Sequence, residues 1–351
     1  MLERYVLCPL SPAHQAEWET FVAGQNGGHL LQSWSWGELK TGANWRPLRL
    51  ALREGDAGNI VAAASILRRT MLHLPPRLGH LAYVPKGPVL DWTASTENGS
   101  SLARLFLLRL RGFLRGRGAL ALQVEPALEK GTSAGQAAVD CLQALKFRET
   151  QPIQPLRTIL LDIEPDEETL LAGMKEKWRY NVRLAARKGV EIRAASTLEE
   201  VQAWYNLLQT TGQRDLFGIH SLEYYCKAWT ILEPRQQCRL LLAWSEGELL
   251  AGIFVSLQGH EAIYLYGASS NARRNLMPNY LLQWEAMRWA RRAGATVYDF
   301  WGIPPTDESD EAMAGVYRFK SGWGGRVTTF IGNYEYDYHP LAMRVARSVL
   351  H

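Results

Sequence analysis

Basic side chains recur at helical spacing in one stretch of this chain. Lys175, Arg179, Arg183 and Arg187 lie four residues apart, so on a helix they would form one column of positive charge. Like charges at this spacing destabilise a helix by about 0.2–0.5 kcal/mol per pair, so the column predicts an anionic partner. The alternative is a solvated face, with the acidic residues 166–168 upstream favourable to the helix dipole. The same helix would bury an apolar stripe made of Met174, Trp178, Val182 and Ala185.

Two further groups have residue types suited to acyl-transfer or sugar-binding sites. Asp299 ends an expected strand, where ligand sites in α/β sheets usually lie, and its carboxylate could hold or deprotonate an attacking amine. The alternative is a structural carboxylate that caps a neighbouring loop. Tyr264 and Tyr266 alternate with apolar residues on another expected strand, so we expect them to face one way. They would stack on a sugar or peptide, or pack in a core.

Several function classes are excluded by missing motifs. The sequence has no HExxH, no GxSxG elbow, no Walker loop and no GxGxxG after a strand, and its 8 histidines lack metal-ligand spacing. We therefore exclude a metalloenzyme, a serine hydrolase and a nucleotide-dependent enzyme, and we expect no metal and no cofactor.

The cysteines and the hydropathy pattern bear on the compartment. The 4 cysteines form no CxxC pair and no zinc spacing, which predicts unpaired thiols in a reducing compartment. The N-terminal stretch has no signal-peptide pattern, and the most apolar expected helix is interrupted by arginines. We expect a cytoplasmic protein without a membrane span.

Length and charge distribution set the scale of the molecule. A chain of 351 residues with 47% hydrophobic and 21% charged residues suits a folded protein of two domains, each of about 150–180 residues. The net charge is only +4, yet residues 174–193 carry 7 Lys and Arg against 2 Glu. The positive charge is concentrated around the basic column.

An internal repeat of predicted elements indicates how these residues are positioned. Residues 48–69 and 238–259 each predict a strand, a glycine-containing turn and a strand, which together form a β-hairpin. A further strand follows each hairpin, at 80–91 and at 261–270. After each third strand come a loop, a helix and another strand: the helices are expected at 101–118 and 278–294, and the strands at 119–126 and 295–303.

This order, with helices also preceding each hairpin, resembles the acyl-CoA N-acyltransferase (GNAT) fold, here present twice. The resemblance implies an α/β (α+β) class with mixed sheets and two tandem GNAT-like domains. We expect the first domain at 1–152, completed by about 326–351, and the second at 153–325. The last strand region, 326–340, and an expected helix at 341–350 could return to either domain.

The loops before the two long helices differ from those of CoA-dependent enzymes. Neither 91–101 nor 269–280 has the glycine pattern whose backbone amides cradle a pyrophosphate. The GNAT-like order without this cradle resembles the FemABX family of non-ribosomal peptidyltransferases, in its compact form without a helical arm. The matching pieces are LLQSWSWGELK (30–40), YVPKGPV (83–89), KWRYNVRLAARKGVEIR (177–193), TGQRDLFGIHSLEYY (211–225), the run from YLYG to FWGI (264–303) and GVYRFKSGWGG (315–325).

The resemblance implies an aminoacyltransferase. Family members move an amino acid from aminoacyl-tRNA to an amino group in the stem peptide of a UDP- or lipid-linked peptidoglycan precursor. The ester donor is already activated, so positioning replaces a covalent nucleophile. Two alternatives stay open: an N-acyltransferase of the same fold acting on a protein N-terminus or an exopolysaccharide-related amine, and a non-enzymatic RNA-binding or scaffold protein.

The resemblance also assigns roles to individual residues. Lys40 and Arg214 would bind the diphosphate of the precursor, whereas the alternatives are a surface lysine that ends a helix and an arginine paired with Asp215. Phe319 and Lys320 would lie at the acyl-transfer site, where the lysine stabilises the oxyanion and the departing 3′-hydroxyl. The alternative for Lys320 is a solvated lysine at a turn. The expected substrate-binding residues are Lys40, Arg214, Tyr264, Tyr266, Trp36 and Asn279, and the expected catalytic residues are Lys320, Phe319 and Asp299.

The basic column then has a candidate partner. The tRNA backbone would supply phosphates for Lys175, Arg179, Arg183 and Arg187, through contacts that carry no sequence information. The residues 273–274, both arginine, are further candidates. The column could instead contact the anionic surface of the inner membrane, where a lipid-linked precursor resides. The sequence does not indicate the transferred amino acid or an oligomeric state.

Overall fold

The protein forms two compact units, seen here in a computed structural model. One unit contains Met1–Leu156 and Thr329–His351, and the other contains Arg157–Thr328. The domain boundaries expected from the sequence, near residues 152 and 326, stay a prediction. The structure describes residues 4–42, 45–55, 58–70, 79–96, 101–215, 217–304, 311–340 and 343, without the side chains of 311–313.

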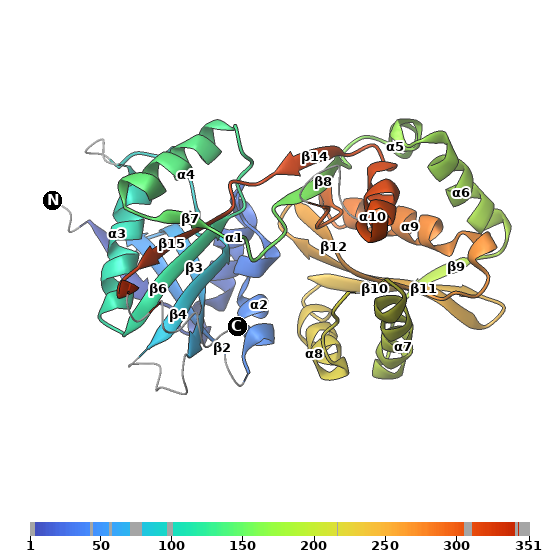
Figure 1. The fold of residues 1–351 in the computed structure, drawn as a ribbon, viewed down its shortest axis with the longest axis horizontal. Coiled ribbons are helices and arrows are strands. Elements are labelled where there is room, and N and C mark those ends of the chain that lie inside the picture. The colour runs from blue at the N-terminus through green and yellow to red at the C-terminus, as the bar shows by residue number, and fades with distance from the viewer. Residues whose placement is uncertain are drawn as a thin grey trace. The chain divides into compact units, whose positions relative to one another are not determined.

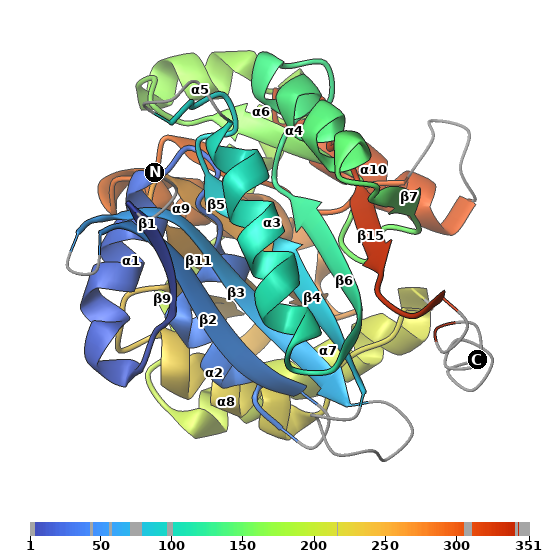
Figure 2. The same cartoon turned by 90° about the vertical axis from the view of Figure 1, so that its left-hand side faces the viewer.

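A mixed sheet forms the centre of the first unit (Figures 1 and 2). Its strands follow the order β1-β2-β3-β4-β6-β15-β7, with β5 paired to β3. Neighbours are antiparallel except β4 and β6, which are parallel and joined through helix α3. The strands are β1 (Tyr5–Pro9), β2 (Trp45–Glu54), β3 (Ile60–Thr70), β4 (His80–Lys86), β5 (Val89–Leu90), β6 (Ala119–Pro126), β7 (Arg148–Thr150) and β15 (Asn333–Asp337).

Helices cover both faces of this sheet, because successive side chains along its strands point to opposite faces and those on both faces are buried. Leu50 and Leu52 pack with helices α3 (Leu102–Arg115) and α4 (Ser133–Ala144). Ala51 lies between them in sequence and packs on the other face, with α1 (Gln15–Gly24) and α2 (Trp34–Lys40). A strand buried on both faces has no polar alternation, which explains the apolar character of this segment.

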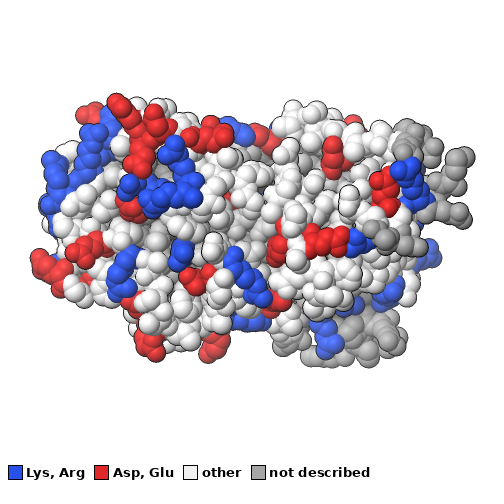
Figure 3. Space-filling view, turned by 180° about the vertical axis from the view of Figure 1, so that it is seen from behind, with Lys and Arg blue, Asp and Glu red and all other residues white. Residues whose placement is uncertain are grey.

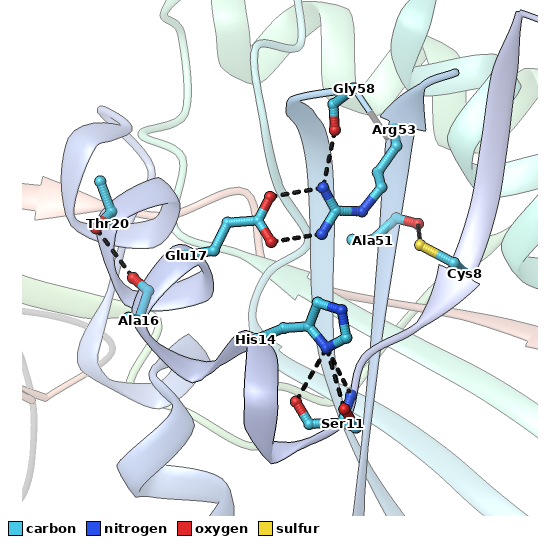
Figure 4. Close-up of polar contacts among 9 residues, drawn as sticks. All are labelled: Cys8, Ser11, His14, Ala16, Glu17, Thr20, Ala51, Arg53 and Gly58. Atoms are coloured by element: carbon cyan, nitrogen blue, oxygen red, sulfur yellow. Dashed lines mark hydrogen bonds and ion pairs between the residues drawn. The ribbon is translucent and has the colours of Figure 1, made fainter. Parts of the chain in front are cut away.

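A buried arginine ties α1 to the sheet (Figure 4). Arg53 on β2 is 8% exposed and donates to both carboxylate oxygens of Glu17, with 2.6 Å between Nη1 and Oε1. Nη1 also donates to the carbonyl of Gly58 at 2.8 Å. Hydrogen bonds from Arg53 hold the pKa of Glu17 below its ordinary value. This bidentate pair sets the position of α1 on the sheet, because the other contacts between them are apolar.

The second unit repeats the same arrangement around its own sheet, of order β14-β8-β13-β12-β11-β10-β9 (Figure 1). The β10–β11 hairpin corresponds to the β2–β3 hairpin of the first unit, and both confirm the predicted internal repeat. The parallel pair here is β12 with β13, joined through α9. The strands are β8 (Arg157–Asp162), β9 (Glu191–Ala194), β10 (Cys238–Ser245), β11 (Glu248–Gln258), β12 (Glu261–Ser269), β13 (Val297–Asp299) and β14 (Arg326–Thr329).

Helices again cover both faces of the second sheet (Figure 1). The apolar residues of α5, α6 and α9 form one core with the sheet and Trp323, whereas Trp204 of α7 packs on the opposite face against Phe254. The predicted apolar stripe from Met174 to Ala185 is buried, as expected. The helices are α5 (Glu167–Gly173), α6 (Glu176–Arg187), α7 (Leu198–Asp215), α8 (Leu222–Leu232), α9 (Pro278–Arg292) and α10 (Glu311–Ser321).

The structure corrects two local expectations and places the last two strands. The strand expected at 295–303 is only β13, Val297–Asp299, because the chain leaves β12 after three paired residues. The acidic residues 166–168 begin α5, a separate helix, so they do not balance the dipole of α6. The end of the chain joins both sheets, through β14 and β15. The helix expected at 341–350 lies outside the described residues except for position 343.

The stripe on α6 gives a stability prediction. Trp178 is 7% exposed, its Nε1 donates to the carbonyl of Phe319 at 2.9 Å, and its ring meets Tyr280 edge-on. Trp178→Ala should lower the free energy of unfolding of the second unit by about 3–5 kcal/mol, because it leaves a cavity. A urea titration followed by circular dichroism measures this change.

The matched control is Tyr180→Ala, two residues along the same helix. Tyr180 is 54% exposed, so its removal should change the free energy of unfolding by less than about 0.5 kcal/mol. Equal losses in the two variants would contradict the assignment of the buried face.

Candidate functional site

A buried charged pair lies where β12 and β13 diverge. Asp299, the last residue of β13, is fully buried, and its Oδ1 accepts from the backbone N–H of Trp301 at 2.7 Å and from the hydroxyl of Thr158. Lys320 of α10 donates through Nζ to the carbonyls of Gly302 at 2.8 Å and Trp301 at 3.3 Å. Both charged side chains therefore bind the same short loop.

Burial changes the electrostatics of Lys320. The residue is 8% exposed, and burial lowers the pKa of its ammonium from 10.5 to about 8, while the charge of Asp299 acts to raise it. The ammonium lies 5.6 Å from the centre of the Tyr264 ring. A lysine with a pKa near 8 is charged at neutral pH yet exchanges its proton readily, as acid–base chemistry requires. The solvated lysine considered as an alternative does not describe this burial.

Phe319 points to a different environment from its neighbour. Its ring meets Tyr280 and Trp323 edge-on, at centroid distances of 5.4 and 5.9 Å, within the apolar core of the unit. Its carbonyl accepts from the indole of Trp178. The predicted Phe-Lys pair is therefore divided, with the aromatic ring among the core residues and the lysine at the loop of Trp301.

The two tyrosines of β12 do not face one way, so that expectation is wrong. The register against β11 shifts between Phe254 and Val255, which pair with Tyr266 and Tyr264 respectively. The extra residue, Leu265, makes a β-bulge, and a bulge breaks the alternation of side chains. Tyr264 accordingly lies by Lys320, on the side of α9 and α10, and Tyr266 contacts α8.

Tyr266 belongs to an aromatic cluster that sequence reasoning missed. Its hydroxyl lies 3.2 Å from that of Tyr224, and the imidazole of His220 is 4.0 Å from the Tyr224 ring. Burial raises the pKa of Tyr224 well above its ordinary value, so its hydroxyl stays protonated. His220 and Tyr224 lie inside the 211–225 piece that carries the family resemblance, and this was the available signal.

Arg214 is held at the end of β12. It makes two parallel bonds to the carboxylate of Asp215, each of 2.8 Å, which is the pairing considered as its alternative. It also donates to the carbonyl of Ser269 and, at 2.9 Å, to Asn271. Asn279, another predicted binding residue, is half-buried in the first turn of α9. The phosphate-binding role of Arg214 stays a prediction.

Lys40 and Trp36 belong to the first unit and lie on α2. The Lys40 ammonium is 4.9 Å from the centre of the Trp36 ring, and burial lowers its pKa to about 8. Lys40 ends its helix, as the alternative had it, but it is half-buried. Trp36 is only 6% exposed. Lys40 and Arg214 fall in different units, so their expected meeting at one diphosphate stays a prediction.

The basic column is split between anchored and exposed residues. Lys175 precedes α6 as its N-cap residue, and Arg179 donates to the carbonyls of Leu171 and Ala172. Arg183 and Arg187 are exposed. Figure 3 shows Lys and Arg side chains gathered at the end of the second unit that carries α6, beside acidic ones.

The further candidates in this region are the arginines at 273 and 274. Both are exposed, and Arg273 is ion-paired with Glu246 at 2.6 Å.

The first unit has a polar cluster at the corresponding carboxyl ends of its parallel strands. Glu125 of β6 is 3% exposed and accepts from the backbone N–H groups of Ile153 and Gln154 and from the hydroxyl of Tyr83 on β4. Lys86, which ends β4, is 1% exposed and donates to Pro155. This place is occupied by the protein's own segment 153–155.

Comparison with known proteins decides the family. The FemAB family model matches residues 13–246 and 237–350. The chain belongs to the FemAB family. A relative named lipid II:glycine glycyltransferase, from Staphylococcus saprophyticus, is 27% identical over 387 residues, covering 91% of this chain and 90% of the relative. The resemblance inferred from the sequence is therefore confirmed.

Solved structures confirm the fold of this FemAB-family protein. The crystal structure of FemX aligns with a TM-score of 0.85 over 97% of this chain and 99% of FemX, at 23% identity. A tandem GNAT protein from the clavulanic acid biosynthesis pathway aligns with a TM-score of 0.55 over 95% of this chain and 98% of that protein, at 13% identity. The predicted pair of GNAT-like units with mixed sheets is confirmed.

The described residues show neither a metal-binding cluster nor a membrane span. They contain no group of three or more His, Cys, Asp or Glu side chains placed to hold a metal ion. In the same residues, every helix is too short or too polar to cross a bilayer.

The lowered pKa of Lys320 gives a prediction for a FemAB-family site. A lysine in the unfolded chain has a pKa of 10.5, whereas the pKa of Lys320 in the folded chain is lowered to about 8. Between these values the unfolded state binds more protons, so the free energy of unfolding rises with pH. Relative to Lys320→Met, the wild type should gain at most about 3 kcal/mol over this window.

Urea titrations of both proteins from about pH 7 to about pH 10 measure the difference. The comparison with Lys320→Met cancels the titration of other groups that the two proteins share. A stability difference that does not change with pH would show that the ammonium has an ordinary pKa.

Proposed function

We propose that this transferase moves an amino acid from an aminoacyl-tRNA to an amino group on the stem peptide of a peptidoglycan precursor, which forms an interpeptide bridge. The observation that carries the proposal is the buried Lys320, with a pKa of about 8, at the divergence of the parallel strands in a FemAB-family chain. The names of the relatives support a lipid-linked acceptor. The proposed location is the cytoplasm, at the surface of the inner membrane.

The reaction is aminolysis of an ester. The acceptor amine attacks the ester carbonyl, a C–N bond forms, the C–O bond to the tRNA ribose breaks, and the proton of the neutral amine ends on the 3′-oxygen. No covalent enzyme intermediate is needed, so the protein acts through position and charge.

Lys320 would supply that charge. An ammonium has three N–H donors, and two of those of Lys320 go to the carbonyls of Trp301 and Gly302. The third would donate to the oxyanion or to the departing 3′-oxygen. Asp299 is fully buried and holds the loop through one oxygen, so its support of the amine would act through its negative charge.

The acceptor diphosphate would bind Lys40 and Arg214. Lys40 has a pKa of about 8, so at neutral pH it carries a charge in a half-buried setting that strengthens its attraction to phosphate. Arg214 has a planar guanidinium whose N–H groups bind Asp215, Asn271 and Ser269, so phosphate would have to share or displace these partners. Oriented guanidinium groups suit phosphate oxygens.

The tRNA donor would contact the outer face of α6. Arg183 and Arg187 are exposed there, and the exposed Tyr180 lies 6.0 Å from the Arg187 guanidinium. Exposed cations that flank an aromatic ring suit a nucleic-acid backbone with nearby bases. Arg179 would contribute from its anchored position, and Lys175 from the start of the helix.

A single-turnover transfer assay tests the reaction. Radiolabelled amino acids from a mixed aminoacyl-tRNA pool are offered to lipid-linked and UDP-linked muropeptides, and labelled product is expected on the lipid-linked acceptor. Lys320→Ala should lower the transfer rate by about 10²–10³, as loss of an oxyanion donor does. Lys40→Ala should mainly raise the acceptor KM.

The control for both lysine variants is Lys130→Ala, which removes an exposed lysine of the first unit and should leave transfer unchanged. Absence of labelled product on either acceptor, from wild-type protein that binds tRNA, would exclude the peptidoglycan reaction.

The role of α6 is tested by the salt dependence of tRNA binding. Arg183→Gln and Arg187→Gln should each reduce the slope of log K against log salt by about one, because each removes a phosphate contact. Arg115→Gln changes the net charge equally, at an exposed position of α3, and should keep the wild-type slope. Unchanged tRNA binding with lost binding to phosphatidylglycerol vesicles would assign α6 to the membrane instead.

A further inference from the structure

The loop after β13 contains an extra residue. The N–H of Phe300 donates to the carbonyl of Ile159 at 3.0 Å, and the N–H of Ile303 donates to that of Arg157 at 3.0 Å. Between these two bonds, Trp301 and Gly302 lie opposite Thr158 alone. Two residues against one is the definition of a β-bulge, a feature common beside active sites, where it re-aims a side chain.

The backbone of Trp301 is strained. Its φ is +60°, in the left-handed region, which costs an L-residue with a bulky side chain and suits glycine. Gly302 is the next residue, yet it is not among the glycines with positive φ. Among the described non-glycine residues with positive φ, Trp301 is the only aromatic one. Such strain persists only where the surroundings over-determine it, typically at ligand-binding positions.

The groups that hold this conformation are the charged pair of the proposed site. Asp299 accepts from the N–H of Trp301 at 2.7 Å, and Lys320 donates to its carbonyl at 3.3 Å. Thr158 in turn donates to Asp299. Two buried charged side chains thus bind the N–H and the carbonyl of one residue, whose indole is half-buried.

Other half-buried rings near Lys320 already pack on aromatic neighbours. Phe319 meets Tyr280 and Trp323 edge-on, and Tyr280 and Trp323 lie tilted against each other, so these three rings contact one another beside the apolar core. A half-buried indole on the residue whose carbonyl Lys320 binds suits the nucleotide that carries the ester. Unpaired bases at RNA ends are commonly recognised by stacking on aromatic side chains.

We propose that Trp301 stacks on the 3′-terminal adenine of the donor tRNA, and that Asp299 and Lys320 also serve as positioning residues for this indole. The inference rests on the proposed function, because it takes aminoacyl-tRNA as the donor. It adds a binding residue for the base of the terminal nucleotide and gives the bulge a role in orienting the ester.

The experiment compares two uncharged tRNAs that are identical except for the terminal adenosine. Wild-type protein should bind the complete tRNA about tenfold more tightly than the shortened one, as expected for one stacked base. Trp301→Asn should lose this ratio, because asparagine tolerates left-handed backbone but offers no ring. Trp301→Phe should keep most of it.

Two further variants test the positioning role. Asp299→Asn can still accept the N–H of Trp301 through its amide oxygen and should keep the affinity ratio, whereas Asp299→Ala should lose it. Thermal unfolding of Trp301→Asn should occur at or above the wild-type temperature, because the strain is relieved. This measurement separates a lost stacking contact from a lost fold.

Each outcome bears on one level of the proposal. Equal binding of the two tRNAs by the wild type, or an unchanged ratio in Trp301→Asn, overturns the stacking inference and leaves transfer from aminoacyl-tRNA intact. Wild-type protein that binds neither tRNA overturns the donor assignment itself, and the stacking inference with it.

Discussion

A buried ammonium needs hydrogen-bond acceptors, and this requirement organises the second unit. The 8% exposed Lys320 meets it with the carbonyls of Trp301 and Gly302, which are available because the chain departs from regular pairing after β13. The short parallel pairing of β12 with β13 and the position of α10 both serve this contact. Removal of the acceptors would leave a charge in an apolar core without partners.

The two units share one architecture but surround the corresponding buried carboxylate with different groups. In each, two parallel strands end beside a buried carboxylate, Glu125 in the first and Asp299 in the second. In the first unit that carboxylate accepts from the backbone of 153–154 at one oxygen and from the hydroxyl of Tyr83 at the other. In the second the carboxylate and a buried lysine bind the same loop. Fold duplication therefore does not imply two equivalent sites.

The sequence predicted the elements better than the side-chain directions. Hairpins, long helices and the stripe around Trp178 follow from local periodicity, and the structure confirms them. The opposite directions of Tyr264 and Tyr266 depend on Leu265, an extra residue visible only from pairing with β11. The split of Phe319 from Lys320 and the contact of His220 with Tyr266 likewise depend on distant elements. Pairing between distant segments decides such features, and the periodicity of one segment does not reveal that pairing.

The first unit is discontinuous, and its sheet is assembled out of chain order. Strand β15, Asn333–Asp337, lies between β6 and β7, although the whole second unit precedes it in the chain. During synthesis the ribosome therefore releases most of the first unit early and its inner strand last. Until then β6 and β7 lack their shared neighbour and expose unpaired edges. The portion translated first is the portion completed last, so the second unit can finish folding as an insertion inside an unfinished host.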